Sequence, residues 1–236
     1  MNYRFAAFAV AASYTGVLYT TPKSRQQRDD PKVIKLRLAI ITAYTAVMTL
    51  LCHALFPGIA EGMGLQFNAN DCLYAAGLTC VPYFVSAYER PPDPDDLLGL
   101  EALRNLAIGP LTEEIIYRGL LCAIYKYYGA SNTQILLETP LYFGLAHINR
   151  GIELYAGGIA AGEIIPMCIA QFIVTWLFGM YSTQLWIRTG SVWPAFVAHA
   201  LCNWVGPPFM GPRAGSTYFI LLFAMIGLWL WLVVRL

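Results

Sequence analysis

The sequence predicts an all-α fold, a polytopic integral membrane bundle of about eight helices. Of the 236 residues, 58% are hydrophobic and 12% are charged, whereas an ordinary soluble domain carries about 25% charged residues. Residues 217–234 are almost entirely apolar, and a helix of that length crosses a hydrocarbon core of roughly 30 Å. Continuous apolar runs of helical length also exclude a membrane β-barrel, whose strands alternate in short segments.

Eight apolar segments are expected to form the helices of a single membrane domain over residues 1–236. They cover residues 5–20, 38–56, 72–88, 103–125, 133–147, 159–187, 192–205 and 217–234. The first segment contains Ala9-Val10-Ala11, so a cleaved signal peptide is an alternative to a first span that stays in place. The apolar stretch before that site is shorter than the usual ~7 to 15 residues, which favours the uncleaved span.

Two hydrophilic breaks indicate the topology. Residues 21–37 hold six of the 15 basic residues, so this loop is expected on the cytoplasmic side and the N-terminus across the membrane. The second break, residues 89–96, contains three prolines that prevent a continuing helix. Since three spans precede it, this break also falls on the cytoplasmic side. Both breaks are expected to flank the access to the polar interior, the alternative being two ordinary solvated connections.

The stretch GPLTEEIIYR, residues 109–118, places two carboxylates and an arginine in an apolar segment. Each ionised side chain near mid-bilayer costs about 2.5 to 3.5 kcal/mol, so such groups usually face a cavity or one another. Glu114 and Arg118 are four residues apart on one helix face and can form an ion pair. Glu113 is rotated by about 100° from Glu114 and is expected to point at something else. Pro110 either kinks this helix or starts it afresh, which would place both carboxylates in a first turn.

Further polar side chains occur in two later segments. His147 ends one apolar run, and His199 and Asn203 are four residues apart and share a helix face. A lone histidine in a membrane helix, such as His53, is more often a satisfied core residue than a catalyst. Two histidines and an asparagine beside a glutamate pair are too costly to serve only as helix-packing contacts. We therefore expect His147, His199 and Asn203 to be functional.

These motifs resemble those of the type II CAAX prenyl proteases, the Ras-converting enzymes of the CAAX protease and bacteriocin-processing family. The motifs are Glu113-Glu114-x-x-x-Arg118, Phe143-x-x-x-His147 and His199-x-x-x-Asn203. The resemblance is clearest over residues 104–208, the motif-bearing core. Upstream of it the match is in hydropathy alone. Two fragments, RNLAIGPLTEE and AHALCNWVG, are similar to the eukaryotic branch.

The resemblance implies an endopeptidase that removes the last three residues from farnesylated or geranylgeranylated Cys-a-a-X proteins. It implies Glu113 as general base, His147 as the residue that helps to orient the water, and His199 with Asn203 as donors to the oxyanion. Glu114 and Arg118 take supporting roles. It also implies an endoplasmic reticulum membrane protein with its active site open to the cytoplasm. Membrane lipid is the expected environment, no cofactor is expected, and a net charge of +1 gives no indication of a nucleic-acid partner.

Three alternatives follow from the same residues. Glu113, His147 and His199 could bind zinc and leave a position for water, although the sequence has no His-Glu-x-x-His helix. Cys202 could act as a nucleophile beside His199, although the six cysteines lie in apolar segments without Cys-x-x-Cys spacing and resemble small core residues. A scaffold or transporter could use the polar groups for helix association or ion passage.

Overall fold

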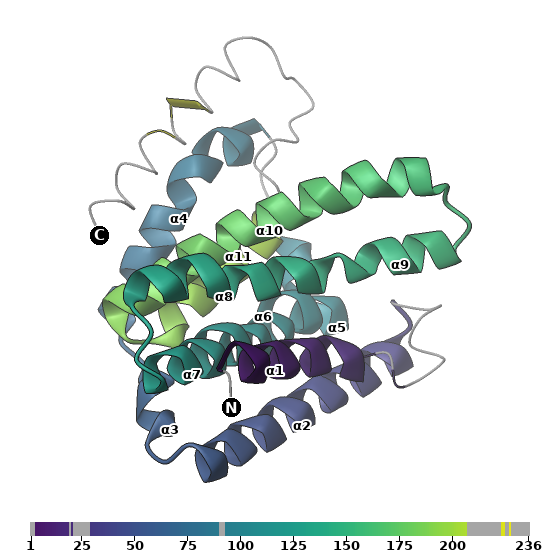
Figure 1. Ribbon diagram of the computed structural model, residues 1–236. Helices are drawn as coiled ribbons and strands as arrows, with labels where there is room; N and C mark the ends of the chain where they lie inside the picture. Colours follow the sequence, from purple (N-terminus) through teal and green to yellow (C-terminus); the bar gives the residue numbers. More distant parts are fainter. Residues whose placement is uncertain are drawn as a thin grey trace.

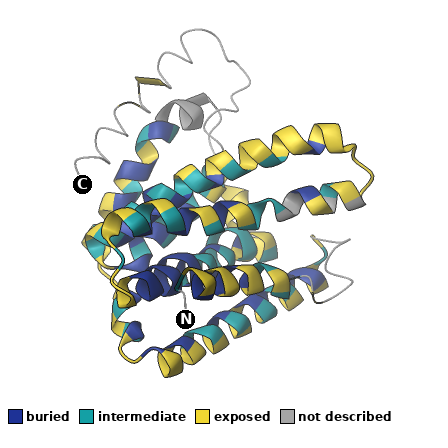
Figure 2. Ribbon diagram, viewed as in Figure 1, coloured by how far each residue is buried: buried dark blue, intermediate teal, exposed yellow. Residues whose placement is uncertain are grey.

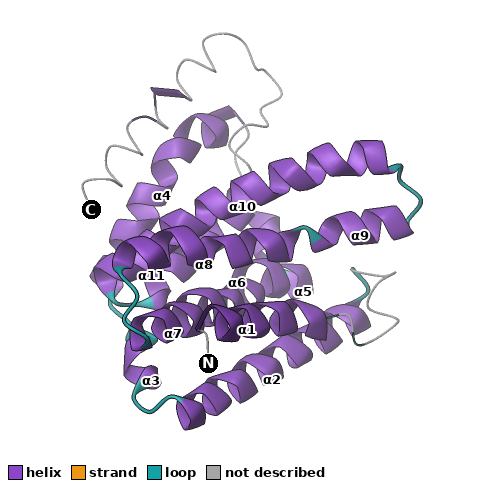
Figure 3. Ribbon diagram, viewed as in Figure 1, coloured by secondary structure: helices purple, strands orange, loops and turns teal. Residues whose placement is uncertain are grey.

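The computed structural model describes residues 3–18, 20, 29–89, 93–206, 223, 224 and 227, and all regular structure in them is helical (Figure 3). The longer helices are α1 (Tyr3–Val17), α2 (Pro31–Leu55), α4 (Ala69–Glu89), α8 (Asn132–His147), α9 (Asn149–Ala156), α10 (Ala161–Thr189) and α11 (Val192–Val205). The short helix α3 (Ile59–Gly62) lies between α2 and α4, and the short 3-10 helix η2 (Pro94–Leu97) follows α4. The all-α fold class is confirmed.

One long helix runs through the centre of the bundle from residue 99 to residue 127. Its consecutive parts are α5 (Gly99–Ala102), the π-helical segment η3 (Leu103–Ile108), α6 (Gly109–Glu114), a second π-helical segment η4 (Ile115–Leu120) and α7 (Leu121–Tyr127). Figure 2 shows its second half enclosed by the other helices. The turn that carries both glutamates therefore lies between two π-helical segments, a feature often found at functional sites.

The other helices pack around this central one (Figure 1). Helices α8 and α10 lie along each other, α11 packs against α4, and α1 contacts both α2 and α7. Large hydrophobic side chains such as Leu50, Leu73 and Ile165 remain exposed on the outside. Within the described residues, α2 with 25 residues and α10 with 29 are long and apolar enough to cross a membrane. These features fit the predicted helical membrane protein, in which lipid covers the outer apolar side chains.

Seven of the eight predicted segments coincide with described helices, and the range 192–205 matches α11 at both ends. The segment 217–234 lies almost entirely outside the described residues. The prediction of a basic loop over residues 21–37 is wrong at its end, because α2 begins at Pro31. The Asp30 side chain accepts a hydrogen bond from the Lys32 amide at 2.7 Å, and proline suits a first helical position. This capping pair starts the helix before the apolar run begins.

Pro110 neither ends the central helix nor restarts it. The preceding π-helical segment lets the Gly109 amide donate to the Arg104 carbonyl, five residues earlier, so the helix accommodates a residue without an amide hydrogen. A side-chain carbon at Gly109 would collide with that same Arg104 oxygen. The π-helical geometry therefore depends on glycine at this position.

We expect Gly109→Ala to lower the free energy of unfolding by about 1 to 3 kcal/mol, because added volume in a packed site forces the backbone to shift. Gly77→Ala is the matched control, since Gly77 lies in α4 with open space around it. There alanine should stabilise the helix by up to about 1 kcal/mol. Thermal unfolding of both variants in detergent checks this, and equal melting temperatures would show that the π-helical turn tolerates a side chain.

Candidate active site

The predicted ion pair between Glu114 and Arg118 is present and fully buried. Arg118 Nη1 donates to Glu114 Oε1 at 3.0 Å, and the exposed fractions of the two side chains are 1% and 0%. The guanidinium also stacks on Phe143, 4.4 Å from the ring centroid, a favourable contact for a desolvated cation. Glu114 and Arg118 thus neutralise one another inside the bundle.

Glu114 has a second partner that lies 85 residues away in the chain. His199 Nδ1 is 2.8 Å from Glu114 Oε1, the same oxygen that accepts from Arg118. A carboxylate beside an arginine is an acceptor, so Nδ1 carries the hydrogen of this bond. The contact fixes the orientation of the His199 ring and directs its Nε2 elsewhere.

That second nitrogen of His199 faces Glu113. The distance between His199 Nε2 and Glu113 Oε2 is 3.8 Å. The Glu113 side chain is 28% exposed, in contrast with the enclosed Glu114. The two adjacent glutamates therefore differ in their surroundings: Glu114 is buried and bound through Oε1 to Arg118 and His199, whereas Glu113 is partly exposed beside an imidazole.

His147 stands at the end of α8 with one ring nitrogen satisfied by its own helix. Its Nδ1 is 2.8 Å from the Phe143 carbonyl oxygen. A carbonyl only accepts, so Nδ1 carries a hydrogen and the Nε2 of the neutral ring is an acceptor. The His147 and His199 rings both lie against the Phe143 ring, with centroids 4.5 Å and 5.9 Å from it. Since His199 Nε2 is also 3.8 Å from Glu113, the three predicted residues lie in one region of the bundle.

Asn203 lies one turn from His199 on α11 but makes a different contact. Its Nδ2 donates to the main-chain carbonyl of Asn105 at 2.9 Å, and its side chain is exposed. An amide nitrogen has two hydrogens, so one remains available. Asn203 joins α11 to the central helix at the edge of the site and does not lie within its buried part.

Aromatic side chains close the site around the two histidines. Phe143 lies with its ring centroid 4.5 Å from that of His147 and 5.9 Å from that of His199. Phe178 of α10 lies 5.0 Å from His199. The motif spacing Phe143-x-x-x-His147 places the first ring on the same face as the histidine. Nothing in the sequence singles out Phe178, because α10 is apolar along most of its length.

Tyr14 brings the N-terminal helix to the site. This buried side chain of α1 lies with its hydroxyl 2.9 Å from Thr112 Oγ1, next to Glu113 in the chain. Because Thr112 donates to carbonyls of its own helix, the Tyr14 hydroxyl is the donor. Sequence reasoning missed this residue, since α1 carries no motif.

Metal ligation is not apparent in the described part of the chain. No group of three His, Cys, Asp or Glu side chains there is arranged to hold a metal ion. One nitrogen of each histidine already has an oxygen partner, at Phe143 and at Glu114. The zinc alternative would therefore depend on the two remaining nitrogens and on Glu113.

The fold and the site define a helical membrane protein with a carboxylate on the central helix, one imidazole at the end of α8, and a second imidazole and an amide on α11. Residues 96–205, which contain all six predicted site residues, match the model of the type II CAAX prenyl endopeptidase family, Rce1-like. The probable CAAX prenyl protease 2 of Schizosaccharomyces pombe is 30% identical, and the alignment covers 92% of this chain and 85% of the relative. The CAAX prenyl protease 2 of Saccharomyces cerevisiae is 32% identical, and the alignment covers 89% of this chain and 81% of the relative. The human CAAX prenyl protease 2 is 30% identical over 86% of this chain and 70% of its own length.

The chain therefore belongs to the Rce1-like type II CAAX prenyl endopeptidase family. The similarity also extends beyond the core expected at residues 104–208, because the aligned part covers most of the chain. The aligned region therefore includes much of the part before residue 104, for which the sequence alone predicted a match in hydropathy. No solved structure matches the chain.

Proposed function

We infer that this chain is an intramembrane endopeptidase that removes the aaX tripeptide from farnesylated or geranylgeranylated CaaX proteins, with water activated by Glu113. The observation that carries the proposal is the position of His199, 2.8 Å from Glu114 and 3.8 Å from Glu113, in a chain of this family. A buried imidazole held by one carboxylate and directed at another is an arrangement suited to hydrolysis. The CaaX substrate class follows from the family.

Glu113 and His147 are suited to position the water together. Both the Glu113 carboxylate and the Nε2 of neutral His147 accept hydrogen bonds. A water that donates one hydrogen to each turns its lone pairs toward the scissile carbonyl carbon. Glu113 then takes a proton as the C–O bond forms, and it returns that proton to the nitrogen of the leaving tripeptide as the C–N bond breaks.

His199 and Asn203 are assigned to the oxyanion. Because Nδ1 of His199 donates to Glu114, Nε2 can donate only when the ring carries its second proton. The oxyanion contact therefore requires the ring that is protonated on both nitrogens. Asn203 adds its free amide hydrogen from the neighbouring turn. Preorganised donors of this kind are commonly the largest contribution to acyl-transfer catalysis.

The membrane setting suits a substrate that is part lipid and part peptide. The prenyl chain can remain in the bilayer while the peptide reaches Glu113 from the side on which the hydrophilic breaks lie. We assign that side to the cytoplasm from the basic residues between the first two apolar segments, and the membrane to the endoplasmic reticulum from the family resemblance.

The test is a cleavage assay with purified protein and a farnesylated Cys-a-a-X peptide, read by mass spectrometry of the released tripeptide. Release by the wild type, with no loss after stringent chelation, supports the glutamate mechanism. Activity that disappears on chelation and returns with zinc would replace it with the metal alternative. Absence of any tripeptide would favour the scaffold or transporter. Cys202→Ser should remain active, and its loss of activity would support the thiol alternative.

Asn203→Ala is expected to lower kcat by about 10²- to 10³-fold, the usual effect of removing one oxyanion donor. Asn105→Ala is the matched control, because Asn203 bonds to the main-chain oxygen of Asn105 and that oxygen is retained. Single-turnover rates of both variants with the farnesylated peptide check the prediction. Wild-type turnover by Asn203→Ala would remove this residue from the mechanism.

A further inference from the structure

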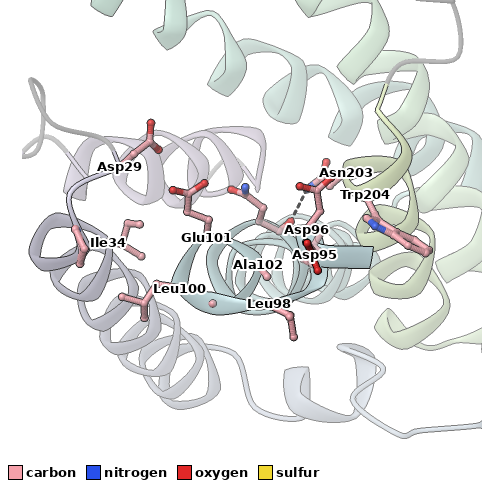
Figure 4. A pocket seen from close by; sticks show the side chains of 14 residues that line it. Asp29, Ile34, Asp95, Asp96, Leu98, Leu100, Glu101, Ala102, Asn203 and Trp204 are labelled. Carbon is pink, nitrogen blue, oxygen red and sulfur yellow. Dashed lines mark hydrogen bonds between the residues drawn. The ribbon is translucent and has the colours of Figure 1, made fainter. Parts of the chain in front are cut away.

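A cavity of about 560 Å³ opens beside Asn203. Figure 4 shows Asn203 and Trp204 at one end of this cavity and Asp29 toward the other. Its wall combines the start of α2, the η2–α5 segment and the end of α11, and Asn105 and Leu106 of the central helix complete it. The described ends of both hydrophilic breaks thus meet at one cavity.

This cavity adjoins the proposed active site at Asn203, which lies in its wall. His199 precedes Asn203 by four residues on α11, about 6 Å along the helix axis at 1.5 Å per residue. An extended peptide advances roughly 3.3 Å per residue. A substrate bound at His199 would therefore reach the cavity within about two residues of the scissile bond.

The cavity wall is acidic. It includes four carboxylates, those of Asp29, Asp95, Asp96 and Glu101, and no lysine or arginine among the described residues. Asp29 is paired with Arg104 at 3.0 Å. For the side chains of the other three, the described part of the chain provides neither an ion pair nor a hydrogen bond. Three carboxylates that have no cationic partner among the described residues therefore line a space large enough for a peptide segment.

This charge indicates which half of the substrate the cavity can accept. The aaX half ends in a free carboxylate, which the acidic wall would repel. The other half, the chain that precedes the prenylated cysteine, carries either polybasic residues or a second, palmitoylated cysteine in most CaaX proteins, and the acidic wall fits the polybasic kind. Apolar wall residues such as Ile34, Leu98 and Leu100 suit the aliphatic stems of lysine and arginine, whose charged ends would reach the carboxylates.

We propose that this acidic cavity binds the lysine- and arginine-rich segment that precedes the prenylated cysteine, so that Asp95, Asp96 and Glu101 determine specificity for basic substrates. The proposal rests on the proposed function, since it names the part of the CaaX substrate that lies there. None of the three residues contacts Glu113, His147 or His199. Their neutralisation should therefore alter substrate selection and leave the chemistry unchanged.

The experiment compares two farnesylated peptides with the same CaaX sequence, one with four lysines before the cysteine and one with serines in their place. They are offered in zwitterionic vesicles at low ionic strength to the wild type and to the triple variant Asp95→Asn/Asp96→Asn/Glu101→Gln. Each exposed charge pair contributes roughly 1.5- to 5-fold in affinity, so the wild type should prefer the lysine peptide by about tenfold in kcat/KM. The triple variant should lose this preference through KM, with its kcat/KM for the serine peptide unchanged.

The matched control is Glu61→Gln/Asp71→Asn/Glu163→Gln, which removes the same charge at positions outside the cavity wall. It should keep the preference for the lysine peptide. Loss of the preference in this control would mean that overall charge is responsible, and would overturn the proposal. Equal cleavage of both peptides by the wild type would also overturn it while leaving the proposed function intact. If neither peptide were cleaved, both proposals would fail.

Discussion

The Glu113→Gln variant is expected to fold as the wild type does and to release the aaX tripeptide about 10²- to 10⁴-fold more slowly, the usual contribution of a general base. Glutamine has nearly the same shape but cannot take a proton from water. The Glu113 side chain is partly exposed, and its distance to His199 Nε2 is 3.8 Å, so the amide replaces no buried ion pair. Single-turnover cleavage of a farnesylated peptide measures the rate, and size-exclusion chromatography in detergent measures the folded yield.

Glu114→Gln is the natural comparison, because it makes the same chemical change one residue further on. Glu114 is fully buried and binds both Arg118 and His199. Its neutralisation should lower the folded yield and also disturb the His199 ring, so that the surviving protein turns over more slowly. Equal folded yields and equal cleavage rates for the two variants would contradict the assignment of Glu113 as the general base and Glu114 as the structural carboxylate.

Sequence spacing alone predicted the contacts that lie within one helix. Glu114 and Arg118 are four residues apart and form the expected pair, and His199 and Asn203 share a face of α11 because helical periodicity places them there. These predictions depend only on local geometry, which the residue order determines. The same holds for the positions of the long apolar helices.

Contacts between helices could not be predicted in this way. The bond from His199 to Glu114 joins residues 85 positions apart, and it depends on how α11 packs against the central helix. Tyr14 and Phe178 reach the site for the same reason. The π-helical segments around Gly109 and Pro110 also escaped prediction, because a proline in an apolar run is compatible with a kink, a new helix or a bulge.

Arg118→Met is expected to lower the free energy of unfolding by about 3 to 5 kcal/mol, since removing one partner of a buried pair leaves an uncompensated charge. Methionine fills part of the space of the arginine side chain, but the Glu114 carboxylate would retain only its contact with His199. The stacking of the guanidinium on Phe143, at 4.4 Å, would also be lost. Unfolding in detergent with increasing denaturant measures the change.

The control and the double variant distinguish loss of this pair from loss of any cation. Lys126→Met removes an exposed lysine whose ammonium lies 4.9 Å from the Trp186 ring centroid, a contact worth about 0.5 to 1 kcal/mol. Arg118→Met combined with Glu114→Gln should cost less than the sum of the single changes, because the buried carboxylate is removed along with its partner. If Arg118→Met proved no more damaging than Lys126→Met, the buried pair would contribute little to stability, and the main role of Glu114 would be to hold His199.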